Sequence, residues 1–247
     1  MKTVRVADHT SITAEQVKKV ASKRVYFGHQ SVGDNIVQGL RELSIEDGVQ
    51  MNILGPDSPT GSGPMFLEFY IGENGNIASK NKAFLAFLAK GAGQRGGVAL
   101  FKYCYADFSA HTDVNQVFQQ YRETVSTIKV KYPALQLVHV TVPLARIDDP
   151  AWKATIKSYL GRANSFDANA KRNQFNEMLQ AEFAGRDPIF DLAKVESTRP
   201  DGSRAFVNFR NHKVFVLSPE LTDDGGHLNA FGRRNAAEQL VITLASL

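Results

Sequence analysis

The chain has 247 residues, of which 43% are hydrophobic and 22% charged, and its formal net charge at pH 7 is +4. This length and composition allow one sizeable globular domain with a complete core, so we expect a single domain over residues 1–247. The basic residues fall into short groups such as Lys18-Lys19 and Arg233-Arg234. This dispersion indicates solvated surface and argues against nucleic acid as the main partner.

The lone cysteine, Cys104, excludes an intramolecular disulfide and a cysteine-rich metal site. No stretch approaches the apolar length of a membrane helix, and the first 15 residues lack the apolar centre of a signal peptide. An exported protein would look the same after removal of its signal, so the sequence leaves the compartment and the oligomeric state open.

The first part of the chain is expected to alternate helix and strand after an irregular arm. Thr13-Ala14-Glu15-Gln16 has the pattern of a capping box at a helix start. Val25 to Phe27 indicates a buried strand, and apolar residues then recur at helical spacing. The expected elements are an arm over 1–12, a helix over 13–22, a strand over 24–28, a helix from the Ser31 turn to about 43, and a strand over 49–54.

The middle of the chain contains two turn-rich stretches that lie between apolar segments. Residues 55–63 form a loop long enough to line a substrate cleft, and residues 71–76 form a second turn. The segment 65–70 fits a strand or a short helix, and the sequence does not decide between them. A helix carrying Phe84 and Leu88 on one broad face should follow, and then a strand over 98–103.

The rest of the chain continues the alternation. A helix over 113–131 ends at Pro133, and the apolar run 135–142 fits a parallel strand that is covered on both faces. The remaining expected elements are a short helix over 152–160, a helix over 168–183, a strand over 189–192, a hairpin of 206–209 with 214–217, and a final helix over 236–247.

A possible catalytic pair lies near the C-terminus, in Asp223-Asp224-Gly225-Gly226-His227-Leu228-Asn229. Asp224 and His227 are three residues apart, so their side chains can touch within one turn. A carboxylate beside an imidazole fixes its tautomer, as a general base acting on a serine requires. Simpler roles are a helix cap for Asp224 and a half-buried surface position for His227.

The candidate nucleophile is Ser31, in Phe27-Gly28-His29-Gln30-Ser31-Val32-Gly33. It lies where a strand meets a helix, so its hydroxyl can project over the sheet edge and its N–H can join the donors of the helix N-terminus. Serine is also common as a plain helix cap at such junctions. No second histidine stands at a metal-ligand spacing, so a metal site is not expected.

The early strand-turn-Ser and the late Asp-x-x-His-x-Asn-x-x-Gly together resemble the SGNH (GDSL-like) hydrolase superfamily. The resemblance implies a three-layer α/β/α sandwich of the flavodoxin-like kind, and the strand pattern predicts a mostly parallel sheet of about five strands. It also implies an esterase without a cofactor, in which Ser31 is the nucleophile, Asp224 the orienting acid and His227 the base.

The same resemblance suggests where the oxyanion of the reaction is bound. Donors would be the N–H groups of Ser31 and Gly75, with Gly72 as a rival to Gly75. Cys104-Tyr105-Ala106-Asp107 stands where the family has Gly-x-Asn-Asp, so Ala106 replaces the asparagine that completes the oxyanion hole. We expect the side chain of Asn74 or Asn76 to take over that role, the alternative being a hole with only backbone donors.

Three further expectations concern the substrate. Arg146, at the end of the 135–142 strand, is expected to contact an acidic or sugar substrate, although a plain surface arginine fits as well. The resemblance suggests an ester of a small molecule or of an acetylated polysaccharide. Two alternatives are an acyltransferase that uses the same triad and a non-catalytic carbohydrate-binding module with the same fold.

Overall fold

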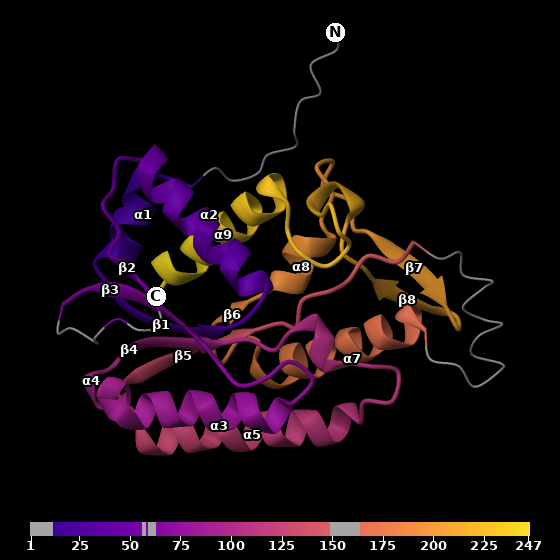
Figure 1. Ribbon diagram of the computed structural model, residues 1–247, viewed down its shortest axis with the longest axis horizontal. Helices are drawn as coiled ribbons and strands as arrows, with labels where there is room; N and C mark the ends of the chain where they lie inside the picture. Colours follow the sequence, from indigo (N-terminus) through magenta and orange to yellow (C-terminus); the bar gives the residue numbers. More distant parts are fainter. Residues whose placement is uncertain (1–11, 56–57, 59–62, 149–163) are drawn as a thin grey trace, which may run out of the picture.

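A parallel sheet of six strands separates two layers of helices in the computed structural model, which describes residues 12–55, 58, 63–148 and 164–247 (Figure 1). The predicted three-layer α/β/α architecture is therefore confirmed. The expected arm, apart from residue 12, the expected short helix over 152–160 and most of the loop over 55–63 lie outside the described residues.

The sheet has six strands rather than the expected five, because Met65–Tyr70 is a strand. Its first five side chains are buried, which a strand covered on both faces explains and a surface helix would not. Only the last two residues of the expected 49–54 strand pair with a neighbouring strand, and they form a short strand at the edge of the sheet. In spatial order the strands are β2 (Ile53–Leu54), β3 (Met65–Tyr70), β1 (Arg24–His29), β4 (Gly97–Phe101), β5 (Leu135–Val140) and β6 (Ile189–Phe190), and each neighbouring pair is parallel.

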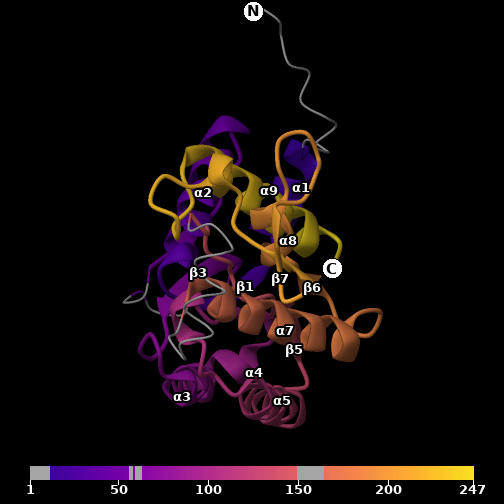
Figure 2. The same ribbon diagram turned by 90° about the vertical axis from the view of Figure 1, so that its right-hand side faces the viewer.

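Helices lie on both sides of the sheet (Figure 2), and a hydrophobic core forms on each of its faces. Successive side chains of β1 point to opposite faces of the sheet, so Val25 and Phe27 pack into one core and Tyr26 packs into the other. The first face is covered by α1 (Ala14–Ala21), α2 (Val32–Glu46), α8 (Leu192–Ser197) and α9 (Ala230–Ala245), and the second by α3 (Ile77–Phe87), α5 (Val114–Lys131) and α7 (Ser165–Phe183).

Local sequence signals account for several element ends. The capping box of Thr13 and Gln16 is present at the start of α1. The last helix begins at Ala230, six residues earlier than expected from its apolar pattern, because the side chain of Asn229 caps it by accepting from the Gly232 N–H at 3.0 Å. Helix α8, which was not expected from the sequence, has six residues and is capped by Asp191.

The expected hairpin is present, but its second strand starts two residues earlier than predicted. Strands β7 (Phe206–Phe209) and β8 (His212–Phe215) are antiparallel. Arg210 and Asn211 form the turn with φ of 51° and 64°. Two consecutive residues with positive φ match the turn that suits the twist of a two-residue hairpin.

Parallel strands bring their carboxyl ends to one edge of the sheet, where ligands bind in open α/β folds. Ser31 follows β1, Tyr105 follows β4 and Arg146 follows β5, so all three lie at that edge. Among the described residues, no helix combines the length and the apolar character needed to cross a bilayer.

Candidate active site

Ser31 lies between the end of β1 and the first turn of α2, and its backbone is strained. Its φ and ψ are 57° and −111°, a region that residues with a side chain rarely occupy. The hydroxyl makes no capping bond to the helix. Instead its Oγ lies 2.8 Å from Nε2 of His227. The structure therefore places the Ser31 side chain against the histidine rather than in the simpler role of a helix cap.

His227 is held by Asp224. The ring Nδ1 lies 2.7 Å from Oδ2 of Asp224. The other oxygen of the carboxylate accepts from the backbone N–H groups of His227 and Gly226 at 2.7 and 2.8 Å. These two backbone bonds, followed by the one from the ring, hold the pKa of Asp224 well below its usual range. Asp224 thus stays a carboxylate and fixes the ring with its proton on Nδ1 and its Nε2 toward Ser31.

The loop that carries Asp224 and His227 is tied to its surroundings by backbone bonds. Gly225, at φ +86°, accepts from the Arg146 N–H at 2.8 Å, so the exit of β5 holds the loop. On the other side, the Leu228 N–H donates to Oδ1 of Asn35 in α2 at 3.1 Å. Asp223 is exposed and lies 3.5 Å from the side-chain amide of Asn229, away from the imidazole.

The residues just before Ser31 support its turn. His29 is fully buried, with Nε2 3.0 Å from Oε2 of Glu68, and burial lowers its pKa. Its ring packs so closely on Gly33 that a Cβ there would lie 2.3 Å away. The Gln30 amide donates to the carbonyl oxygens of Ile71 and Gly72. The turn is thereby joined to the 71–76 segment beyond β3.

Of the three residues expected to donate from that segment, Gly75 already uses its N–H elsewhere, and the two asparagines use their side-chain oxygens in other bonds. The Gly75 N–H donates to Oδ1 of Asp107 at 2.7 Å. The Asn74 side-chain oxygen accepts from the buried ammonium of Lys80 at 2.9 Å, and the Asn76 side-chain oxygen caps α3. Gly75 could receive an oxyanion only after its bond to Asp107 breaks. The oxyanion roles of Gly75, Asn74 and Asn76 therefore stay predictions without geometric support.

Asp107 acts as a buried junction at the end of β4. Its Oδ2 lies 2.6 Å from Nζ of Lys80 and accepts from the Cys104 N–H at 2.6 Å, while its Oδ1 holds the Gly75 N–H. A buried carboxylate is stable when it is paired and bonded in this way. This junction fixes the Tyr105–Asp107 turn, a short 3-10 helix in which Ala106 is exposed.

Arg146 lies beside the site, as expected, but its charge is paired. One guanidinium nitrogen donates to Oδ2 of Asp148 at 3.0 Å, and the side chain passes within 3.6 Å of the place a Cβ would take at Gly225. Its backbone bond to Gly225 shows that it helps to hold the loop that carries Asp224 and His227. Contact with a substrate stays a prediction.

The sequence interpretation missed Tyr105, whose side chain also reaches this site. Its ring lies edge-on to the His227 ring, with centroids 6.0 Å apart. The available signal was its place in the block Cys104–Asp107, but only the fold brings that block against His227.

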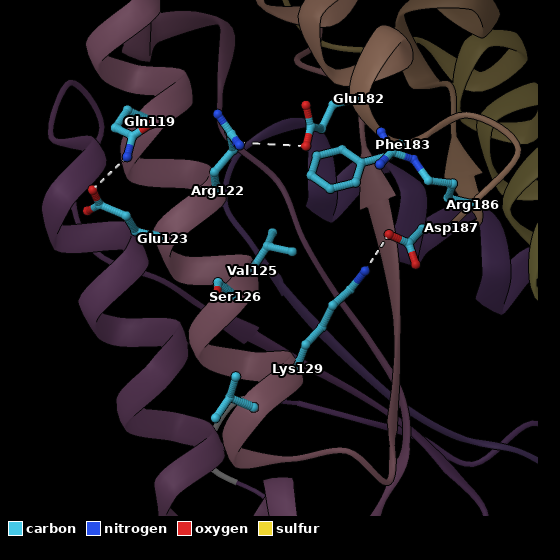
Figure 3. Close-up of a pocket in the computed structure, with 11 residues that line it drawn as sticks. Gln119, Arg122, Glu123, Val125, Ser126, Lys129, Glu182, Phe183, Arg186 and Asp187 are labelled. Atoms are coloured by element: carbon cyan, nitrogen blue, oxygen red, sulfur yellow. Dashed lines mark hydrogen bonds and ion pairs between the residues drawn. The ribbon is translucent and has the colours of Figure 1, made fainter.

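A separate open depression of about 550 Å³ lies between α5 and the end of α7 (Figure 3). Its charges neutralise each other, with Lys129 2.5 Å from Asp187 and Arg122 3.8 Å from Glu182. None of its lining residues belongs to the Ser31 site. They are Gln119, Arg122, Glu123, Val125, Ser126, Lys129, Val130, Glu182, Phe183, Arg186 and Asp187. Within the described part of the chain, no group of three or more His, Cys, Asp or Glu is placed to hold a metal ion.

The fold is that of the GDSL-like hydrolases. A GDSL-like lipase from Bacteroides thetaiotaomicron superposes with a TM-score of 0.54 over 91% of this chain and 88% of its own, at 14% sequence identity. A G-D-S-L family lipolytic protein from Desulfitobacterium hafniense gives 0.52 over 90% and 99%, at 10% identity. No family model and no curated protein sequence matches the chain.

Proposed function

We propose that this protein is a serine ester hydrolase in which Ser31 is the nucleophile, His227 the general base and Asp224 the orienting carboxylate. The observation that carries the proposal is the unbroken series of contacts from Ser31 Oγ to His227 Nε2, at 2.8 Å, and from His227 Nδ1 to Asp224 Oδ2, at 2.7 Å. Three residues from opposite ends of the chain meet in the order that acyl transfer requires. The likeness in fold to GDSL-like hydrolases supports the same reaction class.

The geometry supports the following reaction. Ser31 Oγ attacks the ester carbonyl while His227 Nε2 takes the hydroxyl proton, and Asp224 stabilises the imidazolium through Nδ1. The tetrahedral intermediate collapses when His227 gives the proton to the leaving alkoxide, which departs as an alcohol. Water then attacks the acyl group on Ser31 and loses a proton to His227. When the second tetrahedral intermediate collapses, the bond from the acyl carbon to Ser31 Oγ breaks, His227 returns the proton to Oγ, and the acid leaves.

The backbone at Ser31 favours this role. Strain at φ 57° costs on the order of 1–3 kcal/mol, and such strain persists where the surrounding structure enforces it. The tight packing of His29 on Gly33 and the Gln30 bonds to the 71–76 segment are the enforcing contacts. The strained turn aims the Ser31 hydroxyl at His227 and places its N–H at the N-terminus of α2, where negative charge is favoured.

For the substrate, we propose an ester with a small acyl group on a small molecule or carbohydrate, and we take O-acetylated carbohydrate as the first class to test. The site lies at the carboxyl edge of the sheet beside Arg146, where a polar substrate can approach. The intact geometry of Ser31, His227 and Asp224 favours an enzyme over a non-catalytic binding module of the same fold.

The test combines turnover with covalent labelling. We expect the protein to hydrolyse p-nitrophenyl acetate and to react with a serine-directed phosphonate at Ser31, as identified by peptide mass spectrometry. Ser31→Ala should abolish both. A correctly folded wild-type protein that neither turns over esters nor takes up the phosphonate would refute the proposal. Product analysis on acetylated xylan, with and without an added sugar acceptor, separates release of acetate from transfer of acetyl groups.

A further inference from the structure

The proposed reaction needs a hydrogen-bond donor for the oxyanion. An oxyanion hole usually combines backbone N–H groups with a side-chain donor, and removing one donor costs about 10²–10³ in kcat. Ala106 stands where the related hydrolases carry an asparagine, and its methyl group cannot donate. The Gly75 N–H already bonds to Asp107 at 2.7 Å. Among the described residues, the side chains of Asn74 and Asn76 contact Lys80 and the start of α3 and make no hydrogen bond to Ser31 or His227, so the candidate donor is a different side chain.

Tyr105 brings a side-chain hydroxyl to the loop of Asp224 and His227. A Cβ built at Gly226 would lie 2.8 Å from the Tyr105 hydroxyl oxygen, so the hydroxyl fills the space beside the loop that carries His227. The ring meets the His227 ring edge-on, with centroids 6.0 Å apart. The phenol oxygen thus lies beside the loop that carries the base.

The position of the ring is fixed by its neighbours. The buried Arg172 donates from Nε to the Tyr105 carbonyl oxygen at 2.9 Å, and its guanidinium lies 5.8 Å from the ring centroid. Asp107 holds the start of the same turn through the Cys104 N–H. A donor that is held in place before the reaction contributes more than one that must reorganise during it.

The ionisation of the phenol suits a hydrogen-bond donor. Burial, followed by the nearby charge of Asp224, raises the pKa of Tyr105. A phenol whose pKa lies above the ordinary value of 10.0 keeps its proton at neutral pH and can donate it in a hydrogen bond.

We propose that the Tyr105 hydroxyl is the side-chain donor of the oxyanion hole and takes the part of the asparagine that Ala106 replaces. This inference rests on the proposed function of Ser31. As Ser31 Oγ bonds to the carbonyl carbon, the carbonyl π electrons move to oxygen, and the Tyr105 O–H donates a hydrogen bond to that oxygen. The proton stays on the phenol, and the only proton transferred in this step passes from Ser31 to His227.

Gly226 provides an independent way to displace the hydroxyl. A Cβ there would lie 2.8 Å from the phenol oxygen and 2.9 Å from Cζ, closer than real contacts allow. Gly226 is not among the glycines with positive φ, so its backbone conformation itself accepts alanine. Gly226→Ala should therefore act mainly by pushing the Tyr105 side chain away from the site.

The experiment compares Tyr105→Phe with Tyr103→Phe on p-nitrophenyl acetate. We expect Tyr105→Phe to lower kcat about 10²–10³-fold with KM changed by less than about threefold, since the lost bond forms mainly in the transition state. Tyr103→Phe removes a buried hydroxyl that donates to Asn81 at 2.7 Å on the same strand exit. It should lower thermal stability and leave kcat unchanged. Gly226→Ala should lower kcat as Tyr105→Phe does and add little in the double variant.

The affinity of a trifluoromethyl ketone inhibitor distinguishes two roles for Tyr105, namely a donor to the oxyanion and a residue that only positions Ser31. This inhibitor forms a tetrahedral adduct with a negatively charged oxygen, so its affinity should fall in Tyr105→Phe by the same factor as kcat/KM. Full kcat in Tyr105→Phe would overturn the inference while leaving the Ser31 proposal intact. Reduced kcat with unchanged inhibitor affinity would also overturn it, by showing a positioning role. A wild type that is inactive and unlabelled would instead refute the proposed function.

Discussion

Asp224 accepts two hydrogen bonds from His227, one from the ring Nδ1 and one from the backbone N–H, both at 2.7 Å. The carboxylate therefore fixes the ring and the chain that carries it. This relationship makes Asp224→Asn an informative change, because an amide can present its NH₂ group to Nδ1 and select the wrong tautomer. We expect kcat to fall about 10⁴-fold.

The matched control for that change is the neighbouring carboxylate. Asp223 is exposed and lies away from the imidazole, so Asp223→Asn should leave kcat within about twofold of the wild type. Steady-state kinetics on p-nitrophenyl acetate measures both variants. Greater damage from Asp223→Asn than from Asp224→Asn would show that the wrong carboxylate has been assigned.

The rate should depend on pH through a single ionisation on the acid side. His227 must be neutral to accept the Ser31 proton, so kcat/KM should rise with pH as the imidazolium loses its proton. The pKa of Asp224 is held well below its usual range, so its protonation adds no second step above about pH 4. The logarithm of kcat/KM should then fall with a slope of one toward acid pH.

Two results would contradict this account of the pH profile. A rate that is flat from pH 5 to 8, with acyl transfer shown to be rate-limiting, would exclude His227 as the base. A metal chelator should leave the rate unchanged, and loss of activity that a divalent cation restores would indicate metal-dependent chemistry instead.

The sequence predicted those parts of the site that depend on local spacing. Asp224 and His227 are three residues apart, and Ser31 stands at a strand-helix junction, so their chemistry could be inferred from short segments. The order of helices and strands also predicted the layered fold. The extra strand β3 stayed undecided because a short run that is apolar on both faces fits a buried strand and a buried helix equally well.

Sequence patterns did not predict the contacts that join segments far apart in the chain. The Gly75 N–H, an expected oxyanion donor, is bonded to Asp107, and no local pattern reveals this contact. The closeness of Tyr105 to Gly226 likewise arises from the packing of two loops. Lys80 and Lys102 are almost fully buried, although lysine in a helix or strand normally indicates a solvated position.

Stability should depend on pH through His139, which lies in β5 away from the active site. Its ring stacks on Phe183 at 3.8 Å, its Nδ1 lies 2.7 Å from the Tyr121 hydroxyl and its Nε2 lies 3.3 Å from Asp187. Burial lowers its pKa to about 4, although its hydrogen bond to the Asp187 carboxylate opposes the shift and Lys129 adds to it weakly.

The sign follows from the lowered pKa. The unfolded chain takes up a proton near pH 6.5, whereas the folded protein does so only near pH 4. This stabilisation is complete above about pH 6.5 and is lost as the pH falls toward 4, with about 1.4 kcal/mol gone by pH 5.5. Urea unfolding at pH 7.5 and 5.5 measures it. His139→Gln keeps polar partners and should show a smaller difference between the two pH values; an equal difference in both proteins would show that other groups cause it.

The strain at Ser31 predicts that activity and stability can be separated at this residue. Ser31→Ala and Ser31→Gly should both lower kcat about 10⁶-fold, since each removes the nucleophile. Their stabilities should differ, because glycine adopts φ 57° and ψ −111° freely and alanine does not. In the glycine variant, relief of the backbone strain stabilises the folded protein by on the order of 1–3 kcal/mol. The greater freedom of glycine in the unfolded chain costs about 0.4–1 kcal/mol, so Ser31→Gly should be more stable than Ser31→Ala by about 1 kcal/mol.

The control pair is Ser165→Gly and Ser165→Ala, at the exposed first residue of α7, where alanine should be the more stable. Urea unfolding measures the free energy of unfolding of all four variants. If alanine were more stable than glycine by the same amount at both positions, the backbone of Ser31 would be relaxed and its conformation would not be enforced for catalysis.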